Sequence, residues 1–119
     1  MDTAQDGKKY KHLRIVISHI SEDDRALIIP VSTVHSESQM YDDACILLQG
    51  EHSFLTEQKS YAVYSKAEAL SQKDLDDLER NNKLITYENV SAELLQRLQE
   101  GARNSPYLAK IFTKYFGDF

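Results

Sequence analysis

Five side chains of this 119-residue chain have the functional groups for metal-free acid/base chemistry on a phosphodiester. They are two imidazoles, two hydroxyls and a guanidinium: His12, His52, Ser32, Thr33 and Arg14. Cleavage of RNA by its own 2′-hydroxyl requires removal of one proton, donation of another and stabilisation of negative charge on the phosphoryl group. The same residue types are also ordinary at strand ends and turns, so catalytic and structural roles both stay open.

His52 has the most distinctive surroundings of the four histidines. It lies in a polar loop that begins at Gly50 and returns to the apolar pair Phe54 and Leu55. A histidine held on a rigid scaffold can exchange protons near neutral pH. The alternative is a turn histidine with a structural hydrogen bond. The histidines are too widely spaced to indicate a metal site, and no phosphate-binding glycine loop or His-Glu-x-x-His motif occurs, so we expect neither metal nor cofactor.

Short apolar runs predict the strands that must position these groups. The predicted strands cover residues 13–20, 26–34, 44–48 and 60–64, and residues 84–90 are predicted as the last strand. Pro30 lies within the second run and cannot donate to a ladder, so an edge or a bulge is expected there. A bulge would re-aim the hydroxyls of Ser32 and Thr33. Residues 35–43 have no periodicity and predict a loop.

The last third of the chain changes to helical spacing. Ser71 with Asp74 three residues later predicts a capped, strongly acidic helix, and Ser91 predicts the start of a second helix. Ser105 and Pro106 predict the start of a third. That third helix would carry an apolar stripe at i, i+3, i+4 and i+7, ended by Gly117: Leu108, Ile111, Phe112 and Tyr115. We expect the last two helices to pack on one side of the sheet.

Composition and charge indicate one ordinary globular domain. We expect a flexible tail over residues 1–9 and a single domain over residues 10–119. The polar N-terminus predicts neither a secretory signal nor a membrane span, so a cytoplasmic location is expected. The sole cysteine, Cys45, lies in an apolar run and predicts a buried thiol. Residues 21–100 carry seven Lys or Arg against sixteen Asp or Glu, which argues against DNA and against broad nucleic-acid binding.

Several stretches resemble the MazF/PemK-like family, the small SH3-like barrels of toxin–antitoxin systems that cleave single-stranded RNA. HLRIVIS at 12–18 is similar to that family's Arg-Pro-x-Val-Val-Leu-Ser strand, and IIPVST at 28–33 is similar to its Val-Pro-x-Thr-Thr segment. KSYAVYSKAEAL at 59–70 resembles a later strand with a Lys-Ser-Ile signature. The most specific part is GEHSF at 50–54, which resembles the Gly-Asp-His-Pro-Phe element of a compact PemK-like subgroup.

The resemblance implies a mainly β fold with C-terminal helices (α+β), built as a small, partly open SH3-like barrel that forms a homodimer. His12 stands where the family has a catalytic arginine, and Ser32 where it has a threonine. The roles implied are acid and base for two imidazoles, phosphate binding for two hydroxyls and charge for two cations: His12 and His52, Ser32 and Thr33, Lys11 and Arg14. The substrate implied is single-stranded RNA.

In a second interpretation, the chain is a relative of the same family that has no catalytic activity. The chain would then be a barrel that binds a protein partner, such as an antitoxin-like peptide. The acidic middle of the chain favours this alternative. Fold ancestry does not separate the two functions, because function depends on the site and not on the fold.

Overall fold

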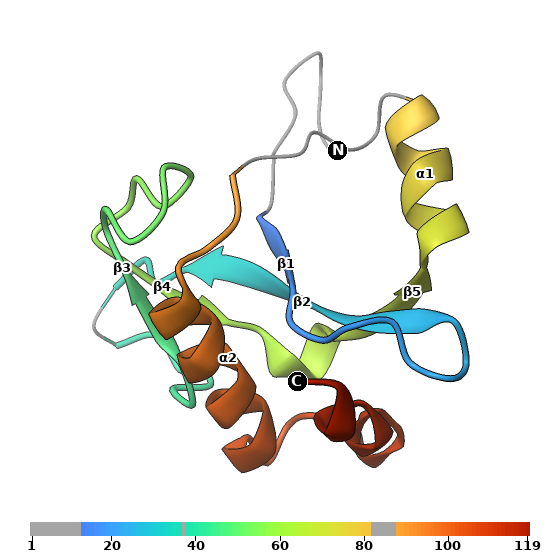
Figure 1. The fold of residues 1–119 in the computed structure, drawn as a ribbon. Helices are drawn as coiled ribbons and strands as arrows, with labels where there is room; N and C mark the ends of the chain where they lie inside the picture. Colours follow the sequence, from blue (N-terminus) through green and yellow to red (C-terminus); the bar gives the residue numbers. More distant parts are fainter. Residues whose placement is uncertain (1–12, 37, 82–87) are drawn as a thin grey trace.

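A computed structural model describes residues 13–36, 38–81 and 88–119, which form an α+β fold around a five-stranded antiparallel sheet (Figure 1). The elements are β1 (Arg14–Val16), β2 (Arg25–Thr33), β3 (Ile46–Leu48), β4 (Lys59–Ala62), the 3-10 helix η1 (Tyr64–Lys66), β5 (Glu68–Ser71), α1 (Gln72–Arg80), α2 (Ala92–Asn104) and the 3-10 helix η2 (Lys110–Asp118). The predicted α+β class is confirmed, and the sheet does not close on itself. Lys11, His12 and the predicted tail lie outside the described residues. So do residues 84–87 of the predicted last strand, while residues 88–90 are not in a strand.

The long strand β2 organises the sheet, because it pairs with three other strands. β1 pairs with one edge of β2, and on the other edge β5 pairs with the first part and β4 with the last part. The register to β5 ends at Ile28 and the register to β4 begins at Val31. Val31 N donates to Leu13 O on the β1 side at 2.9 Å. Because the backbone groups of successive residues in a strand point to opposite edges, the Pro30 nitrogen points to the other edge, between the segments paired with β5 and β4. The expected unpaired position at Pro30 is therefore confirmed, but it arises from a change of partner and not from a bulge.

The first strand is shorter than predicted because the side chain of Ser18 accepts a hydrogen bond that would otherwise continue the backbone pairing with β2. Ile17 N still donates to Leu27 O at 2.9 Å, but the return bond from Leu27 N goes to Ser18 Oγ at 2.8 Å. The chain then turns away through a loop in which Asp24 has a φ of 64°, a left-handed conformation that Asp tolerates. Residues 18–20 therefore belong to the connection to β2 and not to the strand.

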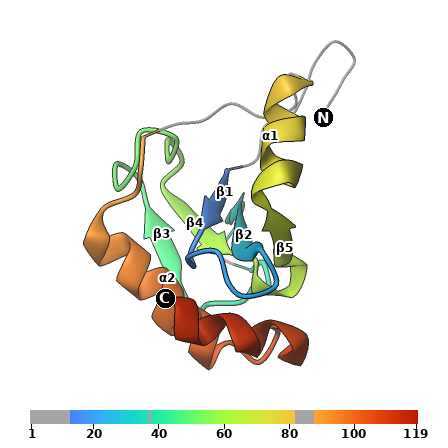
Figure 2. The same cartoon turned by 45° about the vertical axis from the view of Figure 1, so that its right-hand side comes forward.

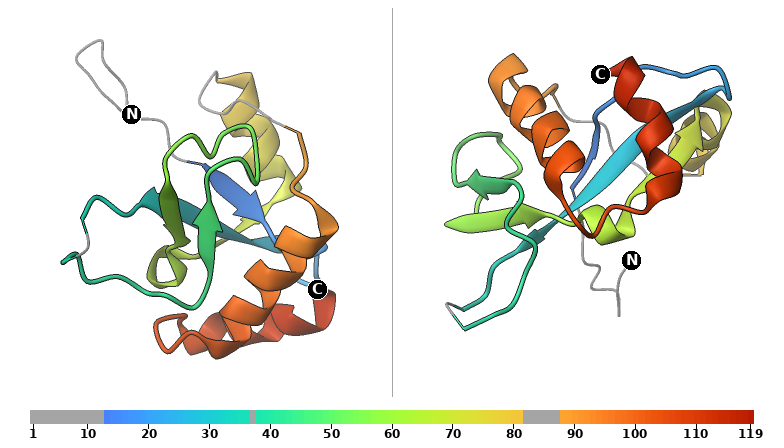
Figure 3. Two further views of the ribbon diagram at one scale, coloured as in Figure 1. Left: turned by 90° about the vertical axis from the view of Figure 1, so that its left-hand side faces the viewer. Right: turned by 90° about the horizontal axis from the view of Figure 1, so that it is seen from below.

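The core lies between the sheet and the two C-terminal helical segments. Figure 3 shows α2 and η2 side by side on one side of the sheet, which confirms the predicted packing. The buried cluster joins alternate residues of β2 to one stripe of α2 and to η2: Leu27, Ile29, Val31, Leu94, Leu98, Ala102 and Tyr115. Each fully buried Leu or Ile side chain contributes about 1.5–3 kcal/mol to folding.

Helix α2 packs closely against Tyr64 and Cys45 at Gly101. The fully buried Tyr64 donates its hydroxyl to Leu98 O at 2.7 Å. A Cβ at Gly101 would lie 2.3 Å from that hydroxyl oxygen and 3.0 Å from Cys45 Cβ, so only glycine fits. Cys45 is buried as predicted, and burial raises the pKa of its thiol, which keeps it unreactive.

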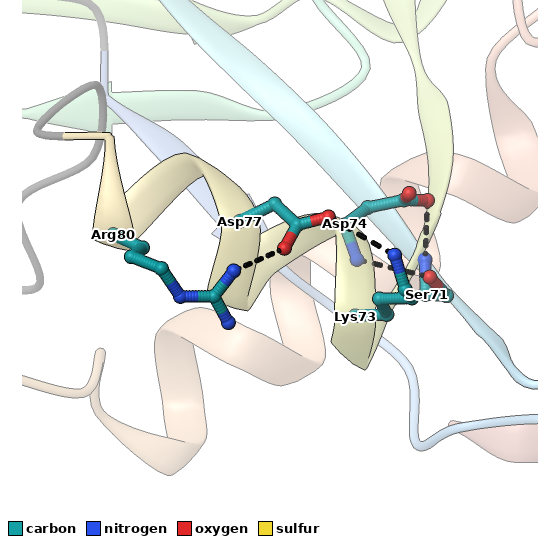
Figure 4. A network of polar contacts seen from close by, with 5 residues as sticks. All are labelled: Ser71, Lys73, Asp74, Asp77 and Arg80. Atoms are coloured by element: carbon teal, nitrogen blue, oxygen red, sulfur yellow. Dashed lines mark hydrogen bonds and ion pairs between the residues drawn. The ribbon is translucent and has the colours of Figure 1, made fainter.

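The acidic helix α1 follows β5 without a loop. Ser71 is both the last residue of β5 and the N-cap of α1: its Oγ accepts from Asp74 N at 3.0 Å, while Asp74 Oδ2 accepts from Ser71 N at 3.1 Å. Asp77 pairs with Lys73 and Arg80 along the same helix (Figure 4). The predicted capping box is confirmed. β5 itself was not predicted, because its sequence EALS contains no β-branched or aromatic residue. Figure 2 shows α1 leaving the sheet at β5, away from α2 and η2.

The last predicted helix begins later and is wound more tightly than its sequence indicates. It is a 3-10 helix that starts after Ala109, and Gly117 lies within it. Leu108 and Tyr115 are buried, but Ile111 keeps 70% of its surface exposed, because three residues per turn do not place it on the same face as Tyr115. The predicted stripe is therefore wrong at Ile111.

Tyr115 anchors η2 to the loop between β1 and β2. Its hydroxyl donates to Asp23 Oδ2 at 2.6 Å, and Lys114 Nζ lies 3.0 Å from the same oxygen. Hydrogen bonds from Ser21, from Tyr115 and from Lys114 hold the pKa of Asp23 well below its usual range. Burial, together with the bond to Asp23, raises the pKa of Tyr115 to about 12.

Candidate functional site

The two predicted hydroxyls lie on opposite faces of β2. The register runs without interruption from Val31 opposite Ala62 to Thr33 opposite Ser60, so neighbouring side chains alternate. Thr33 lies opposite the buried Ser60, whereas Ser32 lies opposite the half-buried Tyr61. The structure thus does not bring Ser32 and Thr33 together around one phosphate.

His52 is buried, with 6% of its surface exposed, and both of its ring nitrogens make hydrogen bonds to the backbone. Nδ1 accepts from Phe54 N at 3.0 Å, and Nε2 lies 2.8 Å from Glu88 O, to which the neutral ring donates. Ser53 N also donates to a Glu88 carboxylate oxygen at 3.3 Å. The imidazole therefore links the loop after β3 to the segment that leads into α2. This geometry corresponds to the structural alternative for His52.

The same loop needs glycine at its first turn. Gly50 has a φ of 90°, which side-chain-bearing residues rarely adopt, and its N–H donates to Leu55 O at 3.0 Å. Leu55 N in turn donates to His52 O at 2.9 Å, and Leu55 is buried in the core. The Gly-Glu-His-Ser-Phe element is therefore a compact structural turn whose apolar end anchors it to the core.

Arg14 is on the outer face of β1, but a carboxylate neutralises it. Its Nη1 lies 3.0 Å from Glu68 Oε1, and both side chains are close to half exposed. It also lines a groove of about 500 Å³ between the sheet and α1 that contains Asp74 and Asp77. One carboxylate paired with the guanidinium and two more lining the same groove do not favour an anion, so the charge that Arg14 was expected to supply to the substrate finds little electrostatic support there.

Ser32 belongs to a different group of side chains, which we call the β4 platform: Ser32, Tyr41, Lys59 and Tyr61. Ser32 and Tyr61 are directly opposed across the β2–β4 ladder, and Lys59 is two residues before Tyr61, so all three share one face. Tyr41 comes from the loop after β2 and packs on Tyr61, with ring centroids 5.1 Å apart and planes inclined by 39°. Lys59 Nζ lies 5.6 Å from the Tyr41 centroid, within cation–π range.

The platform combines a cation, a hydroxyl and two aromatic rings on a surface that the helices do not cover. Lys59 is exposed, and Ser32, Tyr41 and Tyr61 are half-buried. Diagonal neighbours on one face of a sheet lie about 7–8 Å apart, which separates the Ser32 hydroxyl from the Lys59 stem. Ser32 was predicted from the sequence as a site residue, but Tyr41, Lys59 and Tyr61 were not. The only local signal for them is the spacing of Lys59 and Tyr61, because the pairing with Ser32 is long-range.

The outer edge of β3 is covered by an ion pair. β3 pairs with β4 through residues 45, 47 and 49, so the backbone groups of residues 46 and 48 point away from the sheet. Arg97 Nη2 donates to Ile46 O at 2.6 Å, and Leu48 N donates to Glu51 Oε1 at 2.7 Å. Arg97 and Glu51 also pair with each other, which lowers the pKa of Glu51. This clamp occupies the groups through which an edge strand would recruit another strand.

A second groove of about 500 Å³ lies between β5 and η2. Its lining is mixed, with apolar side chains from both elements and charges at the rim: Asp23, Arg25, Ala67, Glu68, Ala69, Leu70, Ile111, Phe112, Lys114 and Tyr115. Ile111 is exposed, and among the described residues β5 pairs only with β2. The groove could accept an apolar side chain of a peptide.

Comparisons with protein-family models, with curated proteins and with solved structures found no match for this chain. In the part of the chain that the structure describes, no three His, Cys, Asp or Glu side chains are placed to hold a metal ion. Within the same residues, no helix combines the length and the apolar character needed to cross a bilayer.

Proposed function

We propose that this protein is related to the MazF/PemK-like barrels and binds single-stranded RNA on the β4 platform. The observation that carries the proposal is the shared face of Ser32, Lys59 and Tyr61, with Tyr41 packed on it. A hydroxyl and an ammonium suit a phosphodiester, and aromatic rings suit unpaired bases. The open sheet in which β2 pairs with three strands supports a partly open SH3-like barrel.

The charge of the chain sets the strength and range of this binding. A formal net charge of −5 opposes a long-range attraction for RNA, so contact must depend on the local cation and on stacking. Only a few phosphates can be neutralised by so small a basic surface. Binding is therefore weak in physiological salt and has a shallow dependence on salt concentration.

Cleavage of the bound RNA would depend on His12 and not on His52. His12 precedes Leu13 in the sequence and lies outside the described residues, while the ring nitrogens of His52 are both used by the backbone. Under the proposal His12 exchanges the proton, Lys11 contributes charge and Ser32 contacts the phosphate. No step needs a metal, so cleavage proceeds in EDTA. By analogy with the related barrels, the active form is a homodimer.

Fluorescence anisotropy with end-labelled single-stranded RNA in EDTA tests the proposal. The wild-type protein should bind the single strand and not the matching duplex, and Lys59→Glu should weaken binding several-fold. Lys73→Glu, on the exposed side of α1, is the matched control and should bind like wild type. Gel analysis of the same reactions reports cleavage, which His12→Ala should abolish. Equal affinity for single strand and duplex, or equal affinity of Lys59→Glu and wild type, would refute this function.

A second candidate function is binding of a protein partner, which the groove between β5 and η2 favours. Ile111 is 70% exposed in that groove beside apolar side chains of both elements, and an exposed apolar surface with a charged rim is typical of a protein-binding site. An antitoxin-like peptide would place an apolar side chain against Ile111 and Phe112. If this function is correct, Ile111→Ser abolishes the interaction with such a peptide in calorimetric titration without changing RNA affinity.

A further inference from the structure

Building on the RNA-binding function proposed above, we propose that Tyr61 and Tyr41 form a stacking site for an unpaired nucleobase. Nothing in the sequence pattern assigns these tyrosines a role. The inference depends on their place on the sheet, on their contact with each other and on the cation beside them.

The position of Tyr61 is fixed by strands on both sides. β4 lies between β2 and β3, and Tyr61 is opposite Ser32 on one side and opposite Ile46 on the other. A residue on a central strand has little backbone freedom, so the Cβ that carries the ring is held in place before any ligand arrives, and the ring itself packs against Tyr41. Preorganisation of this kind lowers the entropic cost of binding.

Tyr41 enlarges the aromatic surface from a separate segment. The two rings are 5.1 Å apart and inclined by 39°, and each side chain keeps part of its surface exposed. A flat base can stack on such a pair whatever its identity, because every base has a π face. Leu48, which is opposite Lys59 and 52% exposed, extends the apolar surface along the same face.

The other tyrosines with defined contacts differ in ways that support this assignment. Tyr64 and Tyr115 are almost fully buried and donate their hydroxyls to Leu98 O and to Asp23. They are core tyrosines, since the ring of each is buried and its hydroxyl makes a hydrogen bond within the protein. Tyr41 and Tyr61 instead lie half-exposed on the sheet face.

Charge identifies the ligand as a nucleic acid strand in preference to an uncharged aromatic ligand. Lys59 extends over the platform from the same strand as Tyr61, and its ammonium can meet a phosphate while the base stacks. Asp42, next to Tyr41 in the sequence, accepts from Ser105 and from Ala44 N, so its carboxylate is engaged at the end of α2. A phosphate beside a stacked base therefore meets the cation of Lys59.

The test compares a short single-stranded RNA of about ten nucleotides with an abasic strand of equal length and charge. Wild-type protein should bind the RNA about tenfold more tightly than the abasic strand, and binding should quench tyrosine emission, which is readable because the chain has no Trp. Tyr61→Leu and Tyr41→Leu should each lose most of that tenfold preference. Tyr61→Phe, which retains the ring, should bind within about twofold of wild type.

Tyr107→Leu is the matched control, since Tyr107 is 60% exposed at the turn between α2 and η2. Circular dichroism of every variant shows whether it is folded. If a Leu variant unfolds, the comparison of RNA with the abasic strand on wild-type protein still tests the proposal. Wild type that binds RNA and the abasic strand equally would overturn the stacking site while leaving the RNA-binding function intact. So would folded Leu variants that bind RNA like wild type. Wild type that binds neither strand would refute both.

Discussion

Replacement of His52 by Phe separates a structural histidine from a catalytic one. Phe retains the ring volume but removes the acceptor for Phe54 N and the donor to Glu88 O. A buried polar group that loses its partner costs about 1–3 kcal/mol. The Phe54 amide is half-buried and bears most of this cost, whereas Glu88 is exposed and water can satisfy its carbonyl. We therefore expect His52→Phe to lower the free energy of unfolding by about 1–3 kcal/mol.

Urea denaturation followed by circular dichroism measures this loss, with His35→Phe as the control. His35 is exposed in the loop after β2, so its replacement should change stability by less than about 0.5 kcal/mol. At temperatures where His52→Phe remains folded, its RNA affinity and cleavage rate should match those of wild type. A variant of wild-type stability that has lost cleavage would refute the structural assignment and restore His52 as acid or base.

Three further predictions test the fold that supports the platform. Arg97→Ala uncovers the edge of β3, so it should cost about 1 kcal/mol and increase self-association in light scattering, whereas Arg103→Ala should not. An Arg97→Ala variant that self-associates no more than wild type would contradict the clamp. Gly101→Ala should destabilise the protein by about 2–3 kcal/mol because its Cβ overlaps a buried tyrosine hydroxyl. Gly117→Ala, whose Cβ would point into open space, should be near neutral. Equal melting curves for the two variants would exclude the close packing of α2 at Gly101. The fold lowers the pKa of Asp23, so the stability that this carboxylate contributes is present above about pH 4 and is lost as pH falls below that value. Asp23→Asn should therefore be less stable at pH 7, and its free energy of unfolding should fall less steeply with acid than that of wild type. Parallel profiles of stability against pH for the two proteins would contradict this role of Asp23.

Local signals in the sequence were enough to predict the starts of α1 and α2 and the main strands. Ser71 and Ser91 cap helices as expected, because capping depends on residues within one turn. β2 appears almost where its apolar run predicts it. Where prediction was wrong, the deciding contact was distant or unusual: Ser18 ends β1 by bonding to Leu27, and β5 forms only because β2 offers it an edge.

The candidate site was harder to predict for the same reason. Ser32 was identified, but its partners depend on the register between β2 and β4, which no local pattern specifies. The imidazole of His52 was correctly placed in a loop next to core anchors, yet its two backbone partners are set by the position of Glu88, far along the chain. Successive side chains of a strand point to opposite faces, so the predicted second strand was by itself enough to place Ser32 and Thr33 on different faces of the sheet.

Chemical-shift mapping by NMR tests the central claim most directly. Single-stranded RNA titrated into isotope-labelled protein should shift amides of the β4 platform and its neighbours, residues 31–34, 41 and 59–62. The amides of α1 and η2 should stay unchanged. Shifts that cluster instead at the groove of Ile111, or at α1, would contradict RNA binding on this face of the sheet.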